Sequence, residues 1–366
     1  MKQLKVIVYA ICKNEEKFVK RWMASMREAD AVYVADTGSE DNTVALLRQA
    51  GAVVNEINVT PWRFDTARNQ SLSFVPEDAD ICVCTDLDEV LEPGWRKALE
   101  AAWQPGLTTR ARYHYTWSFT QEGKPDVYFL LDKVHIRCGY RWTHPVHEVL
   151  TYQNGAEHYT DVPGMQLNHY PDHEKSRAQY LPLLELSVKE QPDDDRNRHY
   201  LGREYLYYGE WDKCIATLQQ HLAMPRAVWR DERAASMRYI ARAFREKGEL
   251  TAAQGWYYRA IAEAPYLREG YAEQAILAYH QGNDALTVAM VSEALKITKQ
   301  PVSYISEGFC YDSTLYDIGS VCAARLGMMR QAAEWGEQAL RLAPQDARIR
   351  DNVKFFYKML ENLPKL

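Results

Sequence analysis

The chain has 366 residues, 46% of them hydrophobic and 26% charged, which is typical of a globular protein with room for two domains. Its formal net charge of −6 argues against a broad nucleic-acid-binding surface. The opening apolar run is too short for a signal peptide, and no run approaches the roughly 18 apolar residues of a membrane span. The seven cysteines are scattered, without C-x-x-C spacing. We therefore expect a cytoplasmic protein with reduced thiols and no structural zinc or disulfide framework.

Strand and helix patterns alternate through the first hundred residues. Short apolar runs predict buried strands at residues 4–11, 31–36, 52–57 and 81–84. The segments between them predict helices, from about 16 to 28, through Leu46 and Leu47 as far as Gly51, and over 63–72. This order predicts a parallel sheet with helices on both faces, an α/β fold of the Rossmann-like kind.

Acidic residues follow two of these strands. Asp36 ends the second strand, and Asp86, Asp88 and Glu89 come directly after the run 81–84. Ligands of open α/β sheets bind at the carboxyl ends of strands, and paired carboxylates there can hold Mg²⁺ or Mn²⁺ together with substrate phosphates. On residue type alone, Asp-x-Asp is more often a solvated turn, and Asp36 could equally be a turn-forming aspartate. No G-x-G-x-x-G or Walker loop is present, so a phosphorylated ligand would need another source of positive charge.

Four motifs carry a resemblance to a known family. "ICKNEEKFV", "VADTGSEDNT", "FDTARNQSL" and "CTDLDEVL" stand in the order and spacing of the family 2 glycosyltransferases with the GT-A fold. The resemblance implies a nucleotide-diphosphate sugar as donor, with a UDP-sugar favoured, and Mn²⁺ or Mg²⁺ on Asp86 and Asp88. It also implies nucleotide contacts from Asn14, Glu15, Asp36 and Asp86, with Asp65 and Arg68 near the diphosphate and sugar. Read without it, Glu15 and Arg68 could be exposed helix residues.

Further candidates follow a second group of expected strands, between residues 108 and 138. The segment "THPVHEVL" carries His147 and Glu148, and "VHE" is similar to a His-Glu motif of these transferases. We take Glu148 as first choice for the general base, assisted by His147, with Asp132 second. The resemblance also implies a downstream histidine in the metal shell, for which His169 is the candidate and His173 the alternative. Histidines in aromatic surroundings are also common as structural residues.

The sequence changes character near residue 175, where helix-rich repeats begin. Glycines recur at 209, 248, 282 and 327 between small and aromatic residues at tetratricopeptide positions. We expect a catalytic GT-A domain over residues 1–174 and tetratricopeptide-like (TPR-like) repeats over 175–366. The insertion 299–316 could line the surface of the repeats or have only structural consequences.

The combined interpretation is an inverting, metal-dependent glycosyltransferase. A GT-A domain followed by TPR-like repeats resembles the bacterial peptide S-glycosyltransferases, which implies a peptide or protein acceptor. A cell-envelope glycan is the alternative acceptor, and a modified nucleic-acid base is disfavoured by the acidic charge. The repeats could instead mediate a homodimer. A different class of function is a catalytically inactive adaptor. The retained acids Asp36, Asp86 and Asp88 argue against it. A nucleotidyltransferase would need a glycine-rich loop where this chain has "CKNEE".

Overall fold

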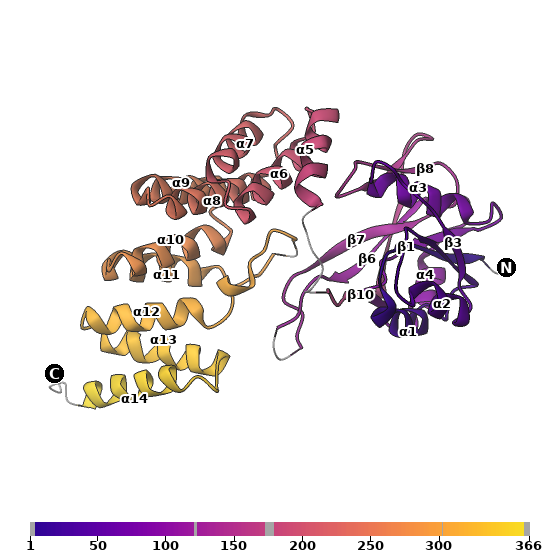
Figure 1. Ribbon diagram of the computed structural model, residues 1–366. Coiled ribbons are helices and arrows are strands. Elements are labelled where there is room, and N and C mark those ends of the chain that lie inside the picture. The colour runs from indigo at the N-terminus through magenta and orange to yellow at the C-terminus, as the bar shows by residue number, and fades with distance from the viewer. Residues whose placement is uncertain (1–3, 121–122, 173–178, 302, 362–366) are drawn as a thin grey trace. The chain divides into compact units, whose positions relative to one another are not determined.

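The computed structural model describes residues 4–120, 123–172, 179–301 and 303–361 (Figure 1). The chain forms two compact units, Met1–Glu190 and Gln191–Leu366. The domain boundary expected at residues 174–175 falls outside the described residues. Across the described part of the chain, no helix combines the length and the apolar character that crossing a bilayer requires. All seven cysteines are free thiols, and all but Cys138 are buried.

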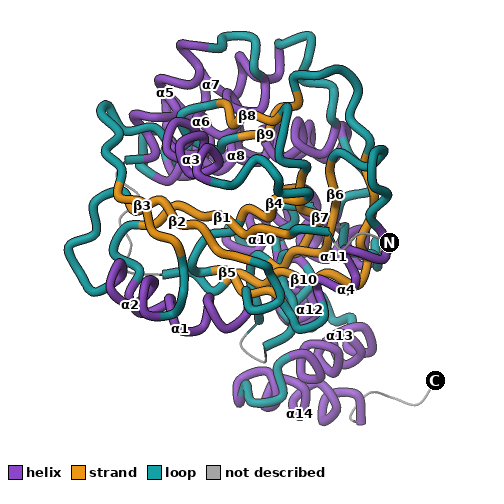
Figure 2. The backbone as a smooth tube through the Cα atoms, turned by 90° about the vertical axis from the view of Figure 1, so that its right-hand side faces the viewer, coloured by secondary structure: helices purple, strands orange, loops and turns teal. Residues whose placement is uncertain are grey.

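An eight-stranded mixed sheet forms the centre of the first unit (Figure 2). Its strands are β1 (Val6–Cys12), β2 (Ala31–Asp36), β3 (Val53–Glu56), β4 (Ile81–Cys84), β5 (Glu89–Leu91), β6 (Arg110–Thr116), β7 (Tyr128–His135) and β10 (Tyr159–His169). They lie in the order β3-β2-β1-β4-β7-β6-β10-β5. The first four are mutually parallel, as the alternating sequence predicts. β7 is antiparallel to β4 and β6, β10 is parallel to β6, and β5 is antiparallel to β10.

Helices cover both faces of this sheet. Because side chains alternate along a strand, Val6, Val8 and Ala10 of β1 face one layer and Ile7 and Tyr9 the other. The first layer contains α1 (Glu16–Ser25), α2 (Thr43–Gln49) and α4 (Trp95–Ala102). The second contains α3 (Phe64–Phe74) and the hairpin of β8 (Tyr140–Thr143) and β9 (Val149–Tyr152). The helix α5 (Tyr180–Glu190) also belongs to this unit, through an ion pair of Glu190 with Arg63 at 2.6 Å.

The second unit consists of stacked helical hairpins (Figure 1). Four pairs succeed one another, followed by a last helix: α6 (Asp195–Tyr207) with α7 (Trp211–Ala223), α8 (Arg230–Glu246) with α9 (Leu250–Glu263), α10 (Arg268–His280) with α11 (Asp284–Lys296), α12 (Thr314–Arg325) with α13 (Met329–Leu342), and α14 (Ala347–Glu361). The glycines at 209, 248, 282 and 327 lie at the turn within each pair, with φ between 70° and 78°. Only glycine adopts that conformation without strain, so the expected tetratricopeptide-like repeats are confirmed.

Part of the insertion between α11 and α12 packs against α8 and α10. The Tyr304 hydroxyl donates to the Glu232 carboxylate of α8. Arg238 of α8 donates to the Ile305 carbonyl at 3.2 Å, and Ser306 donates to Glu269 of α10 at 3.3 Å. The described residues of the insertion therefore lie along the repeats.

Candidate active site

Three loops meet at one edge of the sheet in the first unit. The loop after β1 carries Asn14 and Glu15, β2 ends at Asp36, and the loop after β4 carries Asp86 and Asp88. Because β1 pairs in parallel with both β2 and β4, the carboxyl ends of these strands lie side by side. The strand order reverses direction at β1, and such switch points form the ligand crevices of open α/β sheets.

Asp36 is only 2% exposed and holds the turn that follows it. Its Oδ2 accepts hydrogen bonds from the backbone N–H groups of Gly38 and Ser39, at 3.0 and 2.9 Å. Its Oδ1 accepts from the Ser39 hydroxyl at 2.5 Å and from the Cys12 thiol at 3.4 Å. Burial and the Asp36 carboxylate together raise the pKa of that thiol. Asp36 is thus a turn-forming residue that lies at the expected ligand edge.

Asn14 ties the first loop to the second. Its φ of 54° lies in the left-handed region, where non-glycine residues are uncommon. Its Oδ1 accepts from the Glu40 N–H at 2.8 Å, and its own N–H donates to Ser39 Oγ at 2.9 Å. The Glu15 N–H donates to Thr43 Oγ1 at 2.7 Å. Glu15 is 7% exposed, so the alternative of an exposed helix residue is wrong. A strained, cross-linked loop at a ligand edge is typical of a functional site.

Arg68 of α3 joins two acids that are distant in the sequence. Its Nη2 donates to Asp86 Oδ1 at 2.8 Å, and its Nε donates to Glu148. Arg68 is 4% exposed, and its guanidinium lies over the Trp142 ring, 5.2 Å from the ring centroid. Burial opposes the charge on Arg68, but Asp86 and Glu148 outweigh it and raise the pKa of Arg68. The structure therefore brings Arg68, Asp86 and Glu148 together and rules out an exposed Arg68.

A second cation, Lys133, contacts Asp86 and is not among the candidates that the sequence motifs indicate. Its Nζ lies 3.5 Å from Asp86 Oδ2. Burial alone would raise the pKa of Asp86, but Arg68 and Lys133 overcome that effect and hold it well below its usual range. The signal was faint, because it depends on β7 lying next to β4. Asp132, the adjacent residue of β7, instead pairs with Arg110 at 3.2 Å, since successive side chains of a strand point to opposite faces.

Glu89 fixes the loop that carries the two aspartates. Its Oε2 accepts from the Asp86 N–H at 2.8 Å, and its Oε1 accepts from the Tyr115 hydroxyl at 2.9 Å. Burial raises the pKa of Glu89. Both carboxylate oxygens are therefore used inside the protein, which makes Glu89 a positioning residue for the loop.

Asp88 and His169 lie together, as the resemblance implies. Asp88 Oδ2 is 3.4 Å from His169 Nε2. His169 ends β10, where it pairs with Glu89 of β5, and its ring stacks on Trp117 with centroids 4.4 Å apart. His169 Nδ1 donates to the Trp117 carbonyl at 3.1 Å, which leaves Nε2 directed at Asp88.

The donor set of Asp88 and His169 fits a divalent cation. A carboxylate oxygen and an imidazole nitrogen suit Mn²⁺, and a backbone acceptor on the other ring nitrogen is the usual support of a metal-binding histidine. Asp86 differs, because both of its oxygens face cations. Among the residues that the structure describes, Asp86, Asp88 and His169 do not offer three ligand atoms that lie within 4.8 Å of one another. In this conformation, Asp88 and His169 face each other, and Asp86 is paired with Arg68 and Lys133.

The remaining candidates lie around this centre. Asp65, in the first turn of α3, forms an ion pair with Arg63 at 2.9 Å and is 8% exposed. His147 has a φ of 49°, and its ring centroid lies 6.0 Å from that of Tyr180. The adjacent Glu148 is the member of this segment that reaches Arg68. His173, the alternative metal ligand, lies outside the described residues.

Comparisons with known proteins find matches to parts of the chain. Residues 7–164 match the family described as "Glycosyl transferase family 2". A curated relative, a TPR repeat-containing protein of Synechococcus elongatus, is 26% identical over 272 residues. That match covers 69% of this chain and 65% of the relative, so the chain spans about two thirds of the relative's length.

Solved structures resemble part of the chain at low identity. A crystal structure of MamA is 16% identical with a TM-score of 0.37, over 49% of this chain and 99% of that one. The structure of YrrB, "a TPR protein with an unusual peptide-binding site", is 13% identical with a TM-score of 0.40, over 50% of this chain and 86% of that one.

Proposed function

We propose that the chain transfers a sugar, with inversion, from a nucleotide-diphosphate donor to a peptide or protein acceptor, since residues 7–164 match the family described as "Glycosyl transferase family 2". A UDP-sugar is the favoured donor. The observation that carries the proposal is the pairing of Asp88 with His169 beside the ligand edge formed by β1, β2 and β4.

Asp88 and His169 would hold Mn²⁺ or Mg²⁺. Asp86 would become a third ligand if the donor's diphosphate replaced it as the partner of Arg68 and Lys133. Such an ion would offset the negative charge that develops on the departing diphosphate. Asp88 contributes a carboxylate oxygen, and His169 contributes Nε2. The hydrogen bond from His169 Nδ1 to Trp117 keeps the ring in this orientation.

Arg68 and Lys133 supply positive charge at an edge that has no glycine-rich phosphate loop. Both side chains reach Asp86 from neighbouring elements, α3 and β7. A diphosphate next to Asp86 would find two cations that the fold has already placed and partly desolvated. Asn14, Glu15 and Asp36 shape the adjoining loops, where we place the nucleoside, and Asp65 lies in the same helix as Arg68.

Glu148 is the proposed general base. Its carboxylate would take the proton from the acceptor nucleophile as that atom attacks the anomeric carbon, while the diphosphate leaves from the opposite side. Arg68 holds Glu148 at a fixed position relative to Asp86. His147 would position Glu148 through the constrained backbone that they share. Asp132 is the weaker candidate, because it faces Arg110 on the other side of β7.

The acceptor proposal depends on the second unit. Stacked helical hairpins present extended surfaces that suit peptide segments. The relative named for its TPR repeats supports the presence of TPR-like repeats in the second unit. The peptide or protein acceptor is our proposal. The same repeats could also serve a homodimer.

The decisive experiment is a panel of nucleotide sugars incubated with the purified protein and Mn²⁺. We expect slow hydrolysis of one donor, lost when Mn²⁺ is removed. The preferred donor is then combined with candidate peptides and envelope glycans, and mass spectrometry identifies the product. If no donor is hydrolysed and no nucleoside diphosphate binds in a metal-dependent manner, the enzyme proposal fails and the adaptor interpretation gains support.

A further inference from the structure

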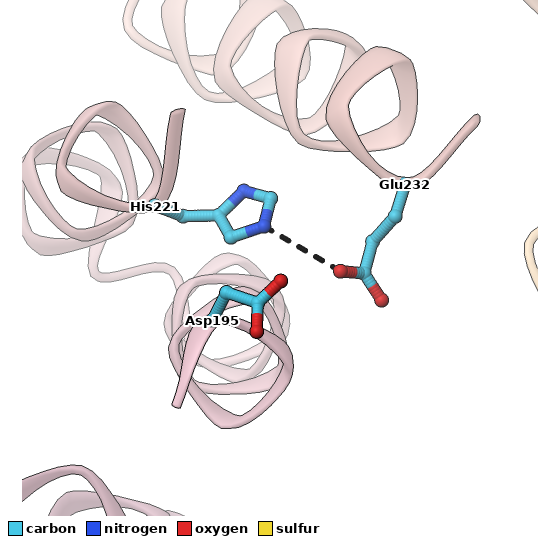
Figure 3. A group of neighbouring side chains, drawn as sticks. All are labelled: Asp195, His221 and Glu232. Atoms are coloured by element: carbon cyan, nitrogen blue, oxygen red, sulfur yellow. Dashed lines mark ion pairs between the residues drawn. The ribbon is translucent and has the colours of Figure 1, made fainter. Parts of the chain in front are cut away.

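A second cluster of metal-ligating residues lies within the repeats, in the second unit of the chain. Asp195 in the first turn of α6, His221 in α7 and Glu232 in α8 each offer one ligand atom, and these atoms all lie within 4.8 Å of one another. Figure 3 shows the three side chains converging from three helices. His221 and Glu232 are buried, with 0% and 2% exposure, whereas Asp195 is half-buried.

The separation of His221 and Glu232 is long for a hydrogen bond. His221 Nε2 lies 3.5 Å from Glu232 Oε1, which is longer than the usual 2.7–3.2 Å of an N–H···O bond. Two ligands about 2.0–2.1 Å from a tetrahedral zinc ion are roughly 3.4 Å apart. The observed separation therefore matches one edge of a zinc tetrahedron.

The buried imidazole of His221 points its Nε2 into the cluster. That nitrogen is buried, and within the described part of the chain it has no hydrogen-bond partner at normal distance, the Glu232 oxygen being 3.5 Å away. The other ring nitrogen, Nδ1, lies 2.9 Å from the Ser236 hydroxyl, which in turn lies 2.7 Å from His199 Nδ1. If His221 Nδ1–H donates to Ser236 and Ser236 donates to His199, then His221 Nε2 carries a lone pair. This is the tautomer that binds metals, and the support of the second nitrogen is typical of such sites.

Glu232 is oriented in a similar way. Its Oε1 faces His221, whereas its Oε2 accepts from the Tyr304 hydroxyl and lies 3.5 Å from Arg196 Nε. The carboxylate thus has one oxygen held by the protein and the other directed into the cluster. Arg196 also balances part of the charge of the two acids.

We propose that Asp195, His221 and Glu232 bind a zinc ion that joins the first three helices of the repeat unit. One nitrogen and two oxygens provide three protein ligands, and water would fill the fourth position on the side of the half-buried Asp195. Because α6, α7 and α8 come from two successive hairpins, the ion would connect the first repeat to the second. The proposal is independent of the transferase site.

The test uses the full-length protein, stripped of metal with a chelator and titrated with Co²⁺, which absorbs visible light strongly when it is tetrahedral. We expect one equivalent to produce that absorption, and one equivalent of Zn²⁺ to abolish it. Asp88→Asn, which alters the transferase site, should leave the signal unchanged. His280→Gln is the matched control, because it removes an exposed histidine from α10.

Variants in the cluster decide the outcome. Asp195→Asn should weaken binding roughly 100-fold or more, since even an outer-shell partner is worth about 10- to 100-fold in affinity. His221→Gln should abolish the signal. If His221→Gln fails to fold by circular dichroism, the half-buried Asp195→Asn still decides the question. A wild-type protein without saturable Co²⁺ absorption, or with the same absorption in Asp195→Asn, would overturn the proposal.

Discussion

Asp88 Oδ2 lies 3.4 Å from His169 Nε2, a contact between a loop after β4 and the last residue of β10. We expect Asp88→Ala and His169→Gln each to reduce metal-dependent donor hydrolysis by about 10²-fold or more, because each removes a group that would stabilise charge on the leaving diphosphate. Initial rates across a Mn²⁺ titration provide the measurement.

Asp161→Asn is the control for this pair of variants. Asp161 is a carboxylate in β10, the strand that ends at His169, but it pairs with Arg112 on the surface, and its side chain is 61% exposed. Its hydrolysis rate should equal that of the wild type. An Asp88→Ala protein that remains folded and fully active would remove Asp88 from the site.

Arg68→Met should destabilise the first unit by roughly 3 kcal/mol. The change leaves Glu148, with an 11% exposed side chain, and the partly buried Asp86 without their shared guanidinium, and breaking a buried ion pair typically costs about 3–5 kcal/mol. Urea unfolding monitored by tryptophan fluorescence measures the loss. Arg112→Met removes a 45% exposed arginine from its pair with Asp161, so its effect should stay below about 1 kcal/mol. Equal losses in the two variants would contradict a special role for Arg68.

His135 predicts how stability changes with pH. Trp142 Nε1–H donates to the Tyr9 hydroxyl, which donates to His135 Nε2, and His135 Nδ1–H donates to the Ile136 carbonyl. This series of hydrogen bonds requires the neutral imidazole, and burial lowers the pKa of His135 to about 3. In the unfolded chain the pKa stays near 6.5, so below that pH the unfolded state binds the proton more readily.

Stability should therefore fall as the pH decreases from 6.5 towards 3, with a slope of up to about 1.4 kcal/mol per pH unit from this one group. Above pH 6.5 the contribution of His135 is constant. The measurement is the difference in unfolding free energy between the wild type and His135→Asn from pH 7.5 to 4.5. The difference should shrink as the pH falls, and a constant difference would show that His135 does not titrate on unfolding.

The sequence predicts most of the fold because the local patterns agree with the tertiary structure. The runs 31–36 and 81–84 are strands with those bounds, and the glycines 209, 248, 282 and 327 all lie in turns. The family resemblance implies one metal shell for Asp88 and His169, and the structure brings these two side chains within 3.4 Å of each other. Lys133 was missed because its role depends on β7 packing antiparallel to β4, which no local pattern encodes. The contact of Arg68 with Glu148 likewise depends on the β8–β9 hairpin lying on the same face as α3.

Two helical glycines test how closely the repeats pack. A Cβ on Gly202 of α6 would lie 2.4 Å from the Leu218 side chain of α7, whereas one on Gly255 of α9 would meet nothing within 4 Å. Gly202→Ala should therefore cost about 1–3 kcal/mol through overpacking, even though alanine favours helices. Gly255→Ala should stabilise the protein by about 0.5–1 kcal/mol, because it removes backbone freedom from the unfolded chain without a clash. Thermal unfolding of the two variants should shift the midpoint in opposite directions. A shift of the same sign in both would mean that α6 and α7 are not in the close contact that a tetratricopeptide-like hairpin requires.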